Sequence, residues 1–426
     1  MKKLFSSIAV LLVMSLPLCA FGQSASASVT KDEVVKSYFD ELTGYRYKPE
    51  HQSFVFETLS GDVLFEHNAD RASDPASVMK TATTLTAIAK LGADYRFTTK
   101  FYTNGVLNTQ TGVLKGDLIV QGSGDPSFYS EDAFAIAQAL NQRGVTKVEG
   151  DLIVTDDFYV NFDPYPQSSA LTFKALLDPK LWDAQTTRAW TAYSVQTPPA
   201  TTAADQLTQK PPISFTGVEI TGKAKVGSDV GAQLLASHDS NVLSHILKEQ
   251  NKYSNNIMAE MVGKKLGGLG VIERYLVNDL KLSPANVHIG SASGLYYSYL
   301  TPRDTLKIIR KLKDLLEASH LRLEDILPVQ GLDQGTLSDR LTQESAGTLV
   351  GKTGTLTQSG VSALTGVIYT KSKGPVVFAI FNHGGNVVRF RKAQDDLLTS
   401  VIDFCGGAAP VNYMPPTRNI ASRTRE

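Results

Sequence analysis

The chain has 426 residues and carries 42 lysines and arginines against 42 aspartates and glutamates. Because these charges balance, no broad attraction to nucleic acid or anionic lipid is expected, and no nucleic-acid partner is predicted. The seven histidines are scattered without metal-ligand spacing, so neither a metal nor another cofactor is predicted. The length favours two domains with a large core.

The N-terminus has the pattern of a secretory signal peptide. Met1-Lys2-Lys3 precedes an apolar run from Leu4 to Ala20, and Ala20-Phe21-Gly22 is an acceptable cleavage site. Residues 1–22 are therefore predicted to be removed from an exported protein of the periplasm or cell envelope. Cleavage would also remove Cys19 and leave Cys405 alone, which excludes a disulfide within the mature chain.

Hydrophobic periodicity predicts helices and strands whose character changes near Phe97. Before that point we expect a helix, a hairpin and a second helix; after it, strand-like runs include Gly-Asp-Leu-Ile-Val twice, with a helix between the copies. This strand–helix–strand repeat predicts a folded insert, whereas Pro164–Pro212 gives no readable pattern. The predicted elements are helices at 31–42, 77–91, 130–142, 242–247, 256–262, 300–316 and 391–405, and hairpins at 53–59/62–66 and 361–370/376–382.

Ser77 and Lys80 lie one turn apart at the start of a predicted helix, in Asp74-Pro75-Ala76-Ser77-Val78-Met79-Lys80-Thr81. A serine becomes a nucleophile beside a base, and a lysine serves as that base when burial and nearby positive charge favour its neutral amine. The plain alternative is a helix N-cap beside a solvated lysine. A second copy of the pattern, from Ser28 to Lys31, opens an amphipathic helix next to the mature terminus, which is a poor place for a preorganised site.

Two further short motifs follow in order, and together with the first they point to one family. The chain contains Ser254-Asn255-Asn256 and then Gly351-Lys352-Thr353-Gly354-Thr355-Leu356. With these motifs, Ser293-Gly294-Leu295 and an insertion directly after the serine helix, the chain resembles the class C low-molecular-mass penicillin-binding proteins. Within that group it is similar to the dacB-type serine D-Ala-D-Ala carboxypeptidases/endopeptidases.

The resemblance implies an α/β (α+β) fold of the penicillin-binding/serine β-lactamase type, in which helices flank an antiparallel sheet. It also implies a large inserted domain after the catalytic serine helix. We therefore expect a penicillin-binding domain made of two parts with the insert between them, and a mobile tail after it. The expected boundaries are 23–96 and 234–409 for the two parts, 97–233 for the insert and 410–426 for the tail.

The resemblance also implies catalytic roles. Ser77 attacks the carbonyl between two terminal D-alanines, Lys80 takes its proton, and Ser254 relays a proton to the leaving D-alanine. Asn256 holds the peptide carbonyl and helps to orient Lys80, while Lys352 keeps Lys80 partly neutral. The expected substrate-binding residues are Thr353, Gly354 and Thr355: Thr353 engages the substrate carboxylate with Lys352, and the backbone N–H groups of Ser77 and Thr355 form the oxyanion hole.

The implied partners are peptidoglycan stem peptides ending in D-Ala-D-Ala, with β-lactams as covalent inhibitors, and a homodimer is left open. In the insert, Asp163 is the predicted carboxylate for the amino end of the peptide's third side chain, chosen over Asp157 because Phe162 and Pro164 flank it. The usual alternative for such a residue is solvated surface.

Three rival functions remain to be weighed. A nucleotide-binding P-loop is excluded because Gly347–Thr353 is one residue short and a strand pattern follows it. A serine β-lactamase shares the acylation chemistry but needs a deacylating base, and the nearest candidate, Glu273, has a spacing that is off by one. A non-catalytic wall-binding protein on the same fold has no physical need for the intact set of serines, lysines and asparagine.

Overall fold

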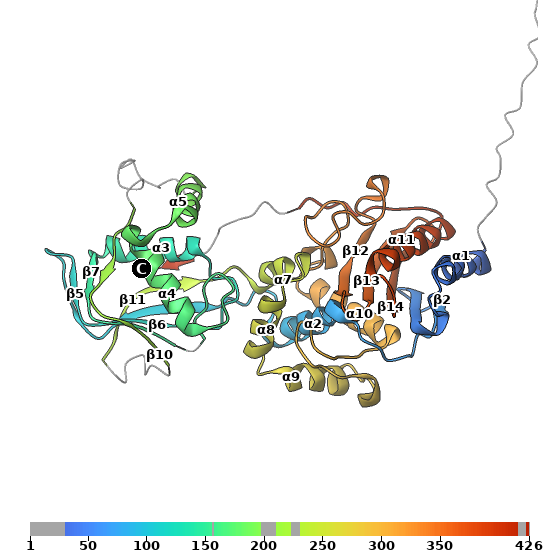
Figure 1. The fold of residues 1–426 in the computed structure, drawn as a ribbon, viewed down its shortest axis with the longest axis horizontal. Coiled ribbons are helices and arrows are strands. Elements are labelled where there is room, and N and C mark those ends of the chain that lie inside the picture. Colours follow the sequence, from blue (N-terminus) through green and yellow to red (C-terminus); the bar gives the residue numbers. More distant parts are fainter. Residues whose placement is uncertain (1–29, 156, 197–209, 223–230, 416–422, 426) are drawn as a thin grey trace, which may run out of the picture.

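A computed structural model describes residues 30–155, 157–196, 210–222, 231–415 and 423–425. Figure 1 shows two lobes side by side, which we name the main lobe and the insert lobe. The signal-peptide prediction falls on residues 1–22 and lies outside the described residues. Among the residues that are described, no helix is both long enough and apolar enough to cross a membrane.

The main lobe is organised around a five-stranded sheet with the order β12-β13-β14-β1-β2. Each neighbouring pair in it is antiparallel. Both predicted hairpins are confirmed, since β1 pairs with β2 and β13 pairs with β14. The strands are β1 Gln52–Thr58, β2 Val63–His67, β12 Leu349–Leu356, β13 Val361–Thr370 and β14 Gly374–His383.

Apolar side chains alternate along the central strands and so build a core on each face of the sheet. Along β1, Phe54 and Phe56 pack into one buried cluster while Val55 packs into the other. Along β14, Phe378 and Phe381 divide in the same way. The antiparallel sheet flanked by helices, expected from the sequence, is confirmed.

Helices cover both faces of this sheet. The N-terminal helix α1 packs beside the late helix α11 on one face, where Figure 1 shows blue next to red, and α2 and α10 lie together on the other. Helix α11 begins four residues earlier than predicted because Asn386 caps it, its side chain accepting from Val388 N and Arg389 N. The helices of the lobe are α1 Lys31–Gly44, α2 Lys80–Leu91, α7 Leu243–Lys252, α8 Asn256–Lys265, α9 Leu269–Arg274, α10 Pro302–Ala318 and α11 Val387–Phe404.

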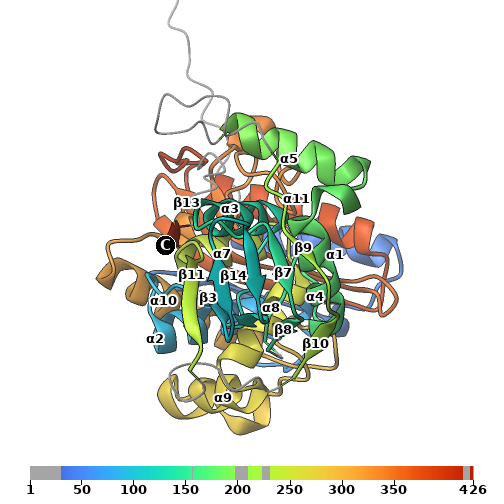
Figure 2. The ribbon, with the colours of Figure 1, turned by 90° about the vertical axis from the view of Figure 1, so that its left-hand side faces the viewer.

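The insert lobe contains the two copies of the repeated strand sequence. They form the parallel neighbours β6 and β8, and the predicted helix between them is α3. Figure 2 looks onto this lobe, with α4 and α5 beside its strands. Its elements are β3 Thr98–Thr103, β4 Val106–Asn108, β5 Val113–Lys115, β6 Leu118–Gln121, α3 Ser130–Gln142, β7 Lys147–Glu149, β8 Leu152–Val154, α4 Pro166–Leu177, α5 Ala184–Gln196, β9 Ser214–Phe215, β10 Glu219–Thr221 and β11 Gln233–Asp239.

The expected end of the insert needs correction. The expected return to the main lobe is at residue 234, but β11 continues to Asp239, which pairs with Thr98 at the start of β3. The buried alternation of this strand keeps Ala236 in the core of the insert lobe. Residues 234–239 therefore belong to the insert sheet, whose order is β10-β8-β6-β3-β11-β15, with β15 formed by Arg423–Arg425. A second sheet has the order β4-β5-β7-β9.

The expected tail without a packing pattern is also wrong in part. Val411 and Tyr413 pack against the main-lobe core, and the Tyr413 hydroxyl donates to Asp333 Oδ1 at 2.9 Å. Further on, β15 (Arg423–Arg425) pairs antiparallel with β11 and extends the insert sheet. Two isolated apolar residues and a strand of 3 residues are too short to give a periodic signal in the sequence.

Candidate active site

Ser77 lies in a 3₁₀ turn, Ala76–Met79, that leads directly into α2. The residue before it, Ala76, has φ +47°, a left-handed conformation that an alanine rarely adopts, and its N–H donates to Asp74 Oδ1 at 2.8 Å. The turn therefore holds Ser77 in a defined, half-buried position. Its hydroxyl caps neither the turn nor α2 and instead accepts from Lys80, so the simple N-cap interpretation is wrong.

Lys80 is completely buried and its Nζ atom faces three acceptors. It lies 2.9 Å from Ser77 Oγ, 2.7 Å from Asn256 Oδ1 and 2.8 Å from the carbonyl oxygen of Ser293. Burial lowers the pKa of Lys80 to about 7, against an opposing effect of the negative Glu260. Lys80 is therefore partly neutral near neutral pH and can accept the proton of Ser77.

Lys352 is the second buried lysine of the site and projects from β12. It donates to Ser254 Oγ and to the carbonyl oxygen of Thr353, both at 2.8 Å. Burial, and after it the positive charge of Lys80, lowers the pKa of Lys352 well below its usual range. The charge of Lys80 thus acts on Lys352, whereas the expected effect of Lys352 on the pKa of Lys80 stays a prediction.

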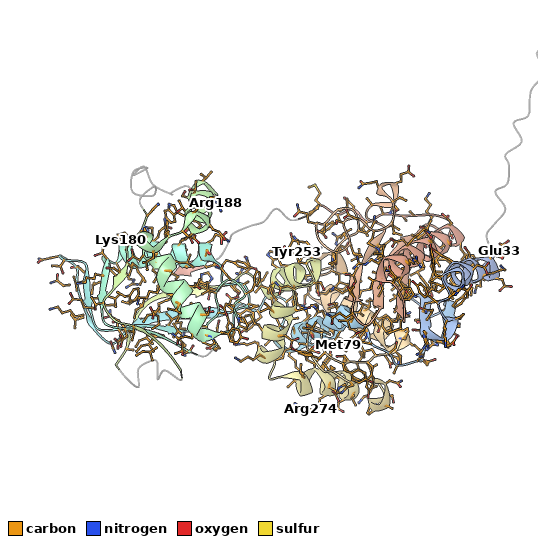
Figure 3. The ribbon with its side chains drawn as sticks, in the orientation of Figure 1. Glu33, Met79, Lys180, Arg188, Tyr253 and Arg274 are labelled. Atoms are coloured by element: carbon orange, nitrogen blue, oxygen red, sulfur yellow. The ribbon has the colours of Figure 1, made fainter. Side chains whose placement is uncertain are left out.

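The junction of α7 and α8 supplies the middle motif. Ser254 has φ +54° between the two helices, and the Asn255 side chain caps α8 by accepting from Met258 N. Asn256 is thereby fixed in the first turn of α8. Figure 3 labels two neighbours of these motifs in the main lobe: Tyr253, which precedes Ser254, and Met79, which precedes Lys80. The labelled Lys180 and Arg188 lie in the insert lobe.

The Lys-Thr-Gly strand packs tightly against the serine turn. A Cβ atom at Gly354 would lie 2.5 Å from the carbonyl oxygen of Pro75, so only a glycine permits this approach. Thr353 is nearly buried, and Thr355 Oγ1 accepts from Arg391 Nη2 at 3.0 Å. Strand β12 therefore runs along the rim of the Ser77 turn.

The predicted motifs thus meet in one place: Ser77, Lys80 and Asn256 share hydrogen bonds, as do Lys352 and Ser254. Sequence reasoning missed two groups, the Ser293 carbonyl and the Arg391 side chain. The carbonyl leaves no side-chain signal, although it belongs to the motif Ser293-Gly294-Leu295. Arg391 reaches Thr355 from a distant helix, which no local pattern reveals.

Two other predicted residues lie outside this cluster. Asp163 Oδ1 accepts from Tyr165 N at 2.9 Å, which is a local turn contact within the insert. Glu273, the β-lactamase candidate, lies on α9, which runs straight into a π-helical segment, Tyr275–Asp279.

Comparison with known proteins identifies the family. The model of the D-Ala-D-Ala carboxypeptidase 3 (S13) family matches residues 48–166 and 183–401. The chain belongs to this family. It is therefore a serine-type D-Ala-D-Ala carboxypeptidase by class, as its motifs indicated.

Individual relatives agree with this assignment. The chain is 26% identical over 446 residues to a D-alanyl-D-alanine carboxypeptidase of Actinomadura sp. (strain R39), covering 84% of this chain and 82% of that one. It is 25% identical over 394 residues to a carboxypeptidase of Mycobacterium tuberculosis, with 83% and 80% covered.

Solved structures share the fold. The predatory peptidoglycan endopeptidase Bd3459 of Bdellovibrio bacteriovorus superposes with a TM-score of 0.72 at 21% identity, over 86% of this chain and 95% of that one. Penicillin-binding protein 4 (dacB) of Haemophilus influenzae superposes with a TM-score of 0.62 at 18% identity, over 85% and 98%. The expected penicillin-binding fold of the S13 family is thereby confirmed.

Proposed function

We propose that this S13-family enzyme cleaves the bond between the two terminal D-alanines of peptidoglycan stem peptides through an acyl-enzyme on Ser77. The observation that carries the proposal is the contact of a buried, partly neutral Lys80 with Ser77 Oγ. Ser77 Oγ attacks the carbonyl carbon while its proton passes to Lys80. The amide bond then breaks, and a water molecule later hydrolyses the ester.

The leaving D-alanine needs a proton on its nitrogen, and Ser254 is our candidate relay. Its hydroxyl accepts from Lys352 Nζ, so its own O–H hydrogen is left for the leaving nitrogen, and the proton that Lys80 took from Ser77 replaces it. The backbone N–H groups of Ser77 and Thr355 stabilise the negative charge that develops on the substrate carbonyl oxygen. The close approach of β12 to the Ser77 turn supports this pairing.

Lys352 and Thr353 bind the free carboxylate of the substrate. Gly354 allows the strand to lie close to the peptide. A fixed cation is the natural partner of a terminal carboxylate, and a neighbouring hydroxyl adds a directed hydrogen bond. The side-chain NH₂ group of Asn256 can donate to the peptide carbonyl while Asn256 Oδ1 accepts from Lys80.

The setting of this chemistry is the cell wall. We propose an exported enzyme of the periplasm or cell envelope, with the inserted domain, running from residue 97 to the end of β11, as a separate folding unit.

Both carboxypeptidase and endopeptidase activity are proposed, because curated relatives are named for the first and structural neighbours for the second. β-Lactams are the expected covalent inhibitors; one structural neighbour was solved as a penicillin G acyl-enzyme. Homodimer formation remains a proposal.

The deciding experiment is intact-protein mass spectrometry after brief exposure to benzylpenicillin. We expect one lasting adduct, located by peptide mapping on the peptide that contains Ser77, and release of D-alanine from a peptide ending in D-Ala-D-Ala. The variant Ser77→Ala should fold normally and take no adduct. Rapid loss of the adduct with no D-alanine release would instead indicate a β-lactamase, and no adduct on the wild type would indicate a non-catalytic protein.

A further inference from the structure

The loop Ser291–Leu295 is held between two helices of the site. On one side, Thr83 of α2 donates its hydroxyl proton to the carbonyl oxygen of Ala292 at 2.7 Å. On the other, the Glu260 carboxylate of α8 accepts from the backbone N–H groups of Ala292 at 3.2 Å and of Ser293 at 2.9 Å. The backbone at Ala292 and Ser293 is therefore fixed from both sides.

The loop is also fixed from within. Ser291 Oγ accepts from the N–H groups of Leu295 at 2.8 Å and Tyr296 at 3.2 Å. Gly294 has φ +74°, and a Cβ atom there would lie 2.0 Å from the carbonyl oxygen of Ala76. The loop thus packs directly against the residue that precedes Ser77.

The orientation of the Ser293 carbonyl bears on catalysis because it accepts from Lys80 Nζ. A neutral amine has two N–H bonds and one lone pair. When Asn256 Oδ1 and the Ser293 oxygen take the two N–H bonds, the lone pair is left for the proton of Ser77. If that carbonyl turned away, the amine could rotate and present an N–H to Ser77 instead.

We propose that Glu260 is a positioning residue of this enzyme: by binding the N–H groups of Ala292 and Ser293, it aims the Ser293 carbonyl at Lys80. Glu260 lies four residues after Asn256, one turn along α8. This helix therefore supplies one acceptor of Lys80 directly, Asn256 Oδ1, and positions a second, the Ser293 carbonyl oxygen, through Glu260. This inference rests on the proposed function, because it takes Lys80 to be the base that acts on Ser77.

The charge of Glu260 acts on the same group. Two charged residues face Lys80 from neighbouring elements, Lys352 from β12 and Glu260 from α8. Glu260 raises the pKa of Lys80 against the larger effect of burial. Removing the carboxylate charge should therefore lower that pKa, and losing the Ser293 contact to the ammonium form should lower it further.

The test compares Glu260→Gln, Glu260→Asp and the control Glu344→Gln, which removes an exposed glutamate from the turn Gln343–Ser345 outside the site. The second-order rate constant of benzylpenicillin acylation is measured from about pH 5 to 9 for each. We expect Glu260→Gln to be slowed on the order of tenfold on the high-pH plateau, because the base is misplaced. Its acid limb should also move to lower pH by about half a unit or more. Glu260→Asp, which keeps the charge on a shorter side chain, should lose rate with a much smaller shift.

The outcomes separate this inference from the function on which it rests. Loss of rate in Glu260→Gln without a shift of the acid limb, or with a shift to higher pH, would mean a merely structural role and overturn the inference. Behaviour of Glu260→Gln like that of Glu344→Gln would overturn it as well. Failure of the wild type to acylate at any pH would count against the proposed function itself.

Discussion

Lys80 Nζ and Asn256 Oδ1 lie 2.7 Å apart although 176 residues separate them in the chain. The contact joins the first turn of α2 to the first turn of α8, and the insert lobe lies between them in the sequence. The proposed base, Lys80, is therefore held by Asn256 only when the chain has returned from the insert. This one hydrogen bond makes the geometry of the site depend on the two parts of the main lobe coming together.

The variant Lys80→Arg tests whether Lys80 is the base. It preserves the positive charge, but a guanidinium group does not lose its proton in a protein, so it cannot accept one from Ser77. Acylation by benzylpenicillin should fall by more than about a hundredfold, since a positioned base contributes at least that much. Stopped-flow or timed mass measurements of acylation give the rate, and thermal unfolding controls for the fold. A rate within about tenfold of the wild type would mean that another group is the base.

The pH dependence of acylation follows from the lowered pKa of Lys80. Because the neutral amine is the reactive form, the rate should rise about tenfold per pH unit on the acid side and level off above the pKa of about 7. An unperturbed lysine would keep the rate rising towards pH 10. Acylation measured from pH 5 to 9 separates the two cases, and an acid limb that is still rising at pH 9 contradicts the prediction.

The sequence predicted those parts of the site that consist of particular side chains at a fixed spacing. Ser77 lies in the 3₁₀ turn and Lys80 begins α2 three residues later, while Lys352 precedes a recognisable hairpin. Local patterns placed these residues near their elements, and the family resemblance joined the three motifs into one site. The Ser293 carbonyl could not be found in this way, because every residue has one and only the folded loop decides where it points.

The insert shows the same limit in the fold. Helix α3 carries a clear apolar stripe and was predicted with its exact bounds, whereas α4 and α5 lie within Pro164–Pro212 and were missed. Residues Trp182 and Trp190 there pack against Phe134 of α3. Those helices are thus defined by contacts with an element more than forty residues earlier, which no local pattern contains.

Gly354→Ala should damage the site by displacing β12 from the Ser77 turn. The new Cβ would lie 2.5 Å from the Pro75 carbonyl oxygen and 3.2 Å from Ala76 Cβ, so strand and turn must move apart. We expect acylation to slow by more than about tenfold through misplacement, together with a loss of about 1–3 kcal/mol in the free energy of unfolding from overpacking. The matched control is Gly44→Ala in α1, where the added carbon meets nothing within 4 Å. Equal acylation by the two variants would show that this close approach does not matter for catalysis.

Asp163→Asn tests whether the insert reads the third side chain of the stem peptide. The loop that carries Asp163 is anchored on the main lobe: Phe162 packs against the main-lobe core, and Lys264 of α8 donates to the Tyr159 hydroxyl at 2.6 Å. Asp163 is thus held close to the helix that carries Asn256. Its carboxylate accepts from Tyr165 N, a bond that the amide oxygen of asparagine can keep, so the turn should survive the substitution.

A carboxylate at this place would pair with the ammonium group of a diaminopimelate or lysine side chain, and a partly desolvated pair is worth on the order of 1–3 kcal/mol. Asp163→Asn should therefore lower kcat/KM by about five- to a hundredfold for such peptides. Acylation by benzylpenicillin, which lacks the ammonium group, should hardly change. The control Asp157→Asn alters a carboxylate that accepts from Thr155 Oγ1 in the same lobe and should affect neither substrate. An equal loss on both substrates would indicate a structural role for Asp163, and no loss on either would make it ordinary surface.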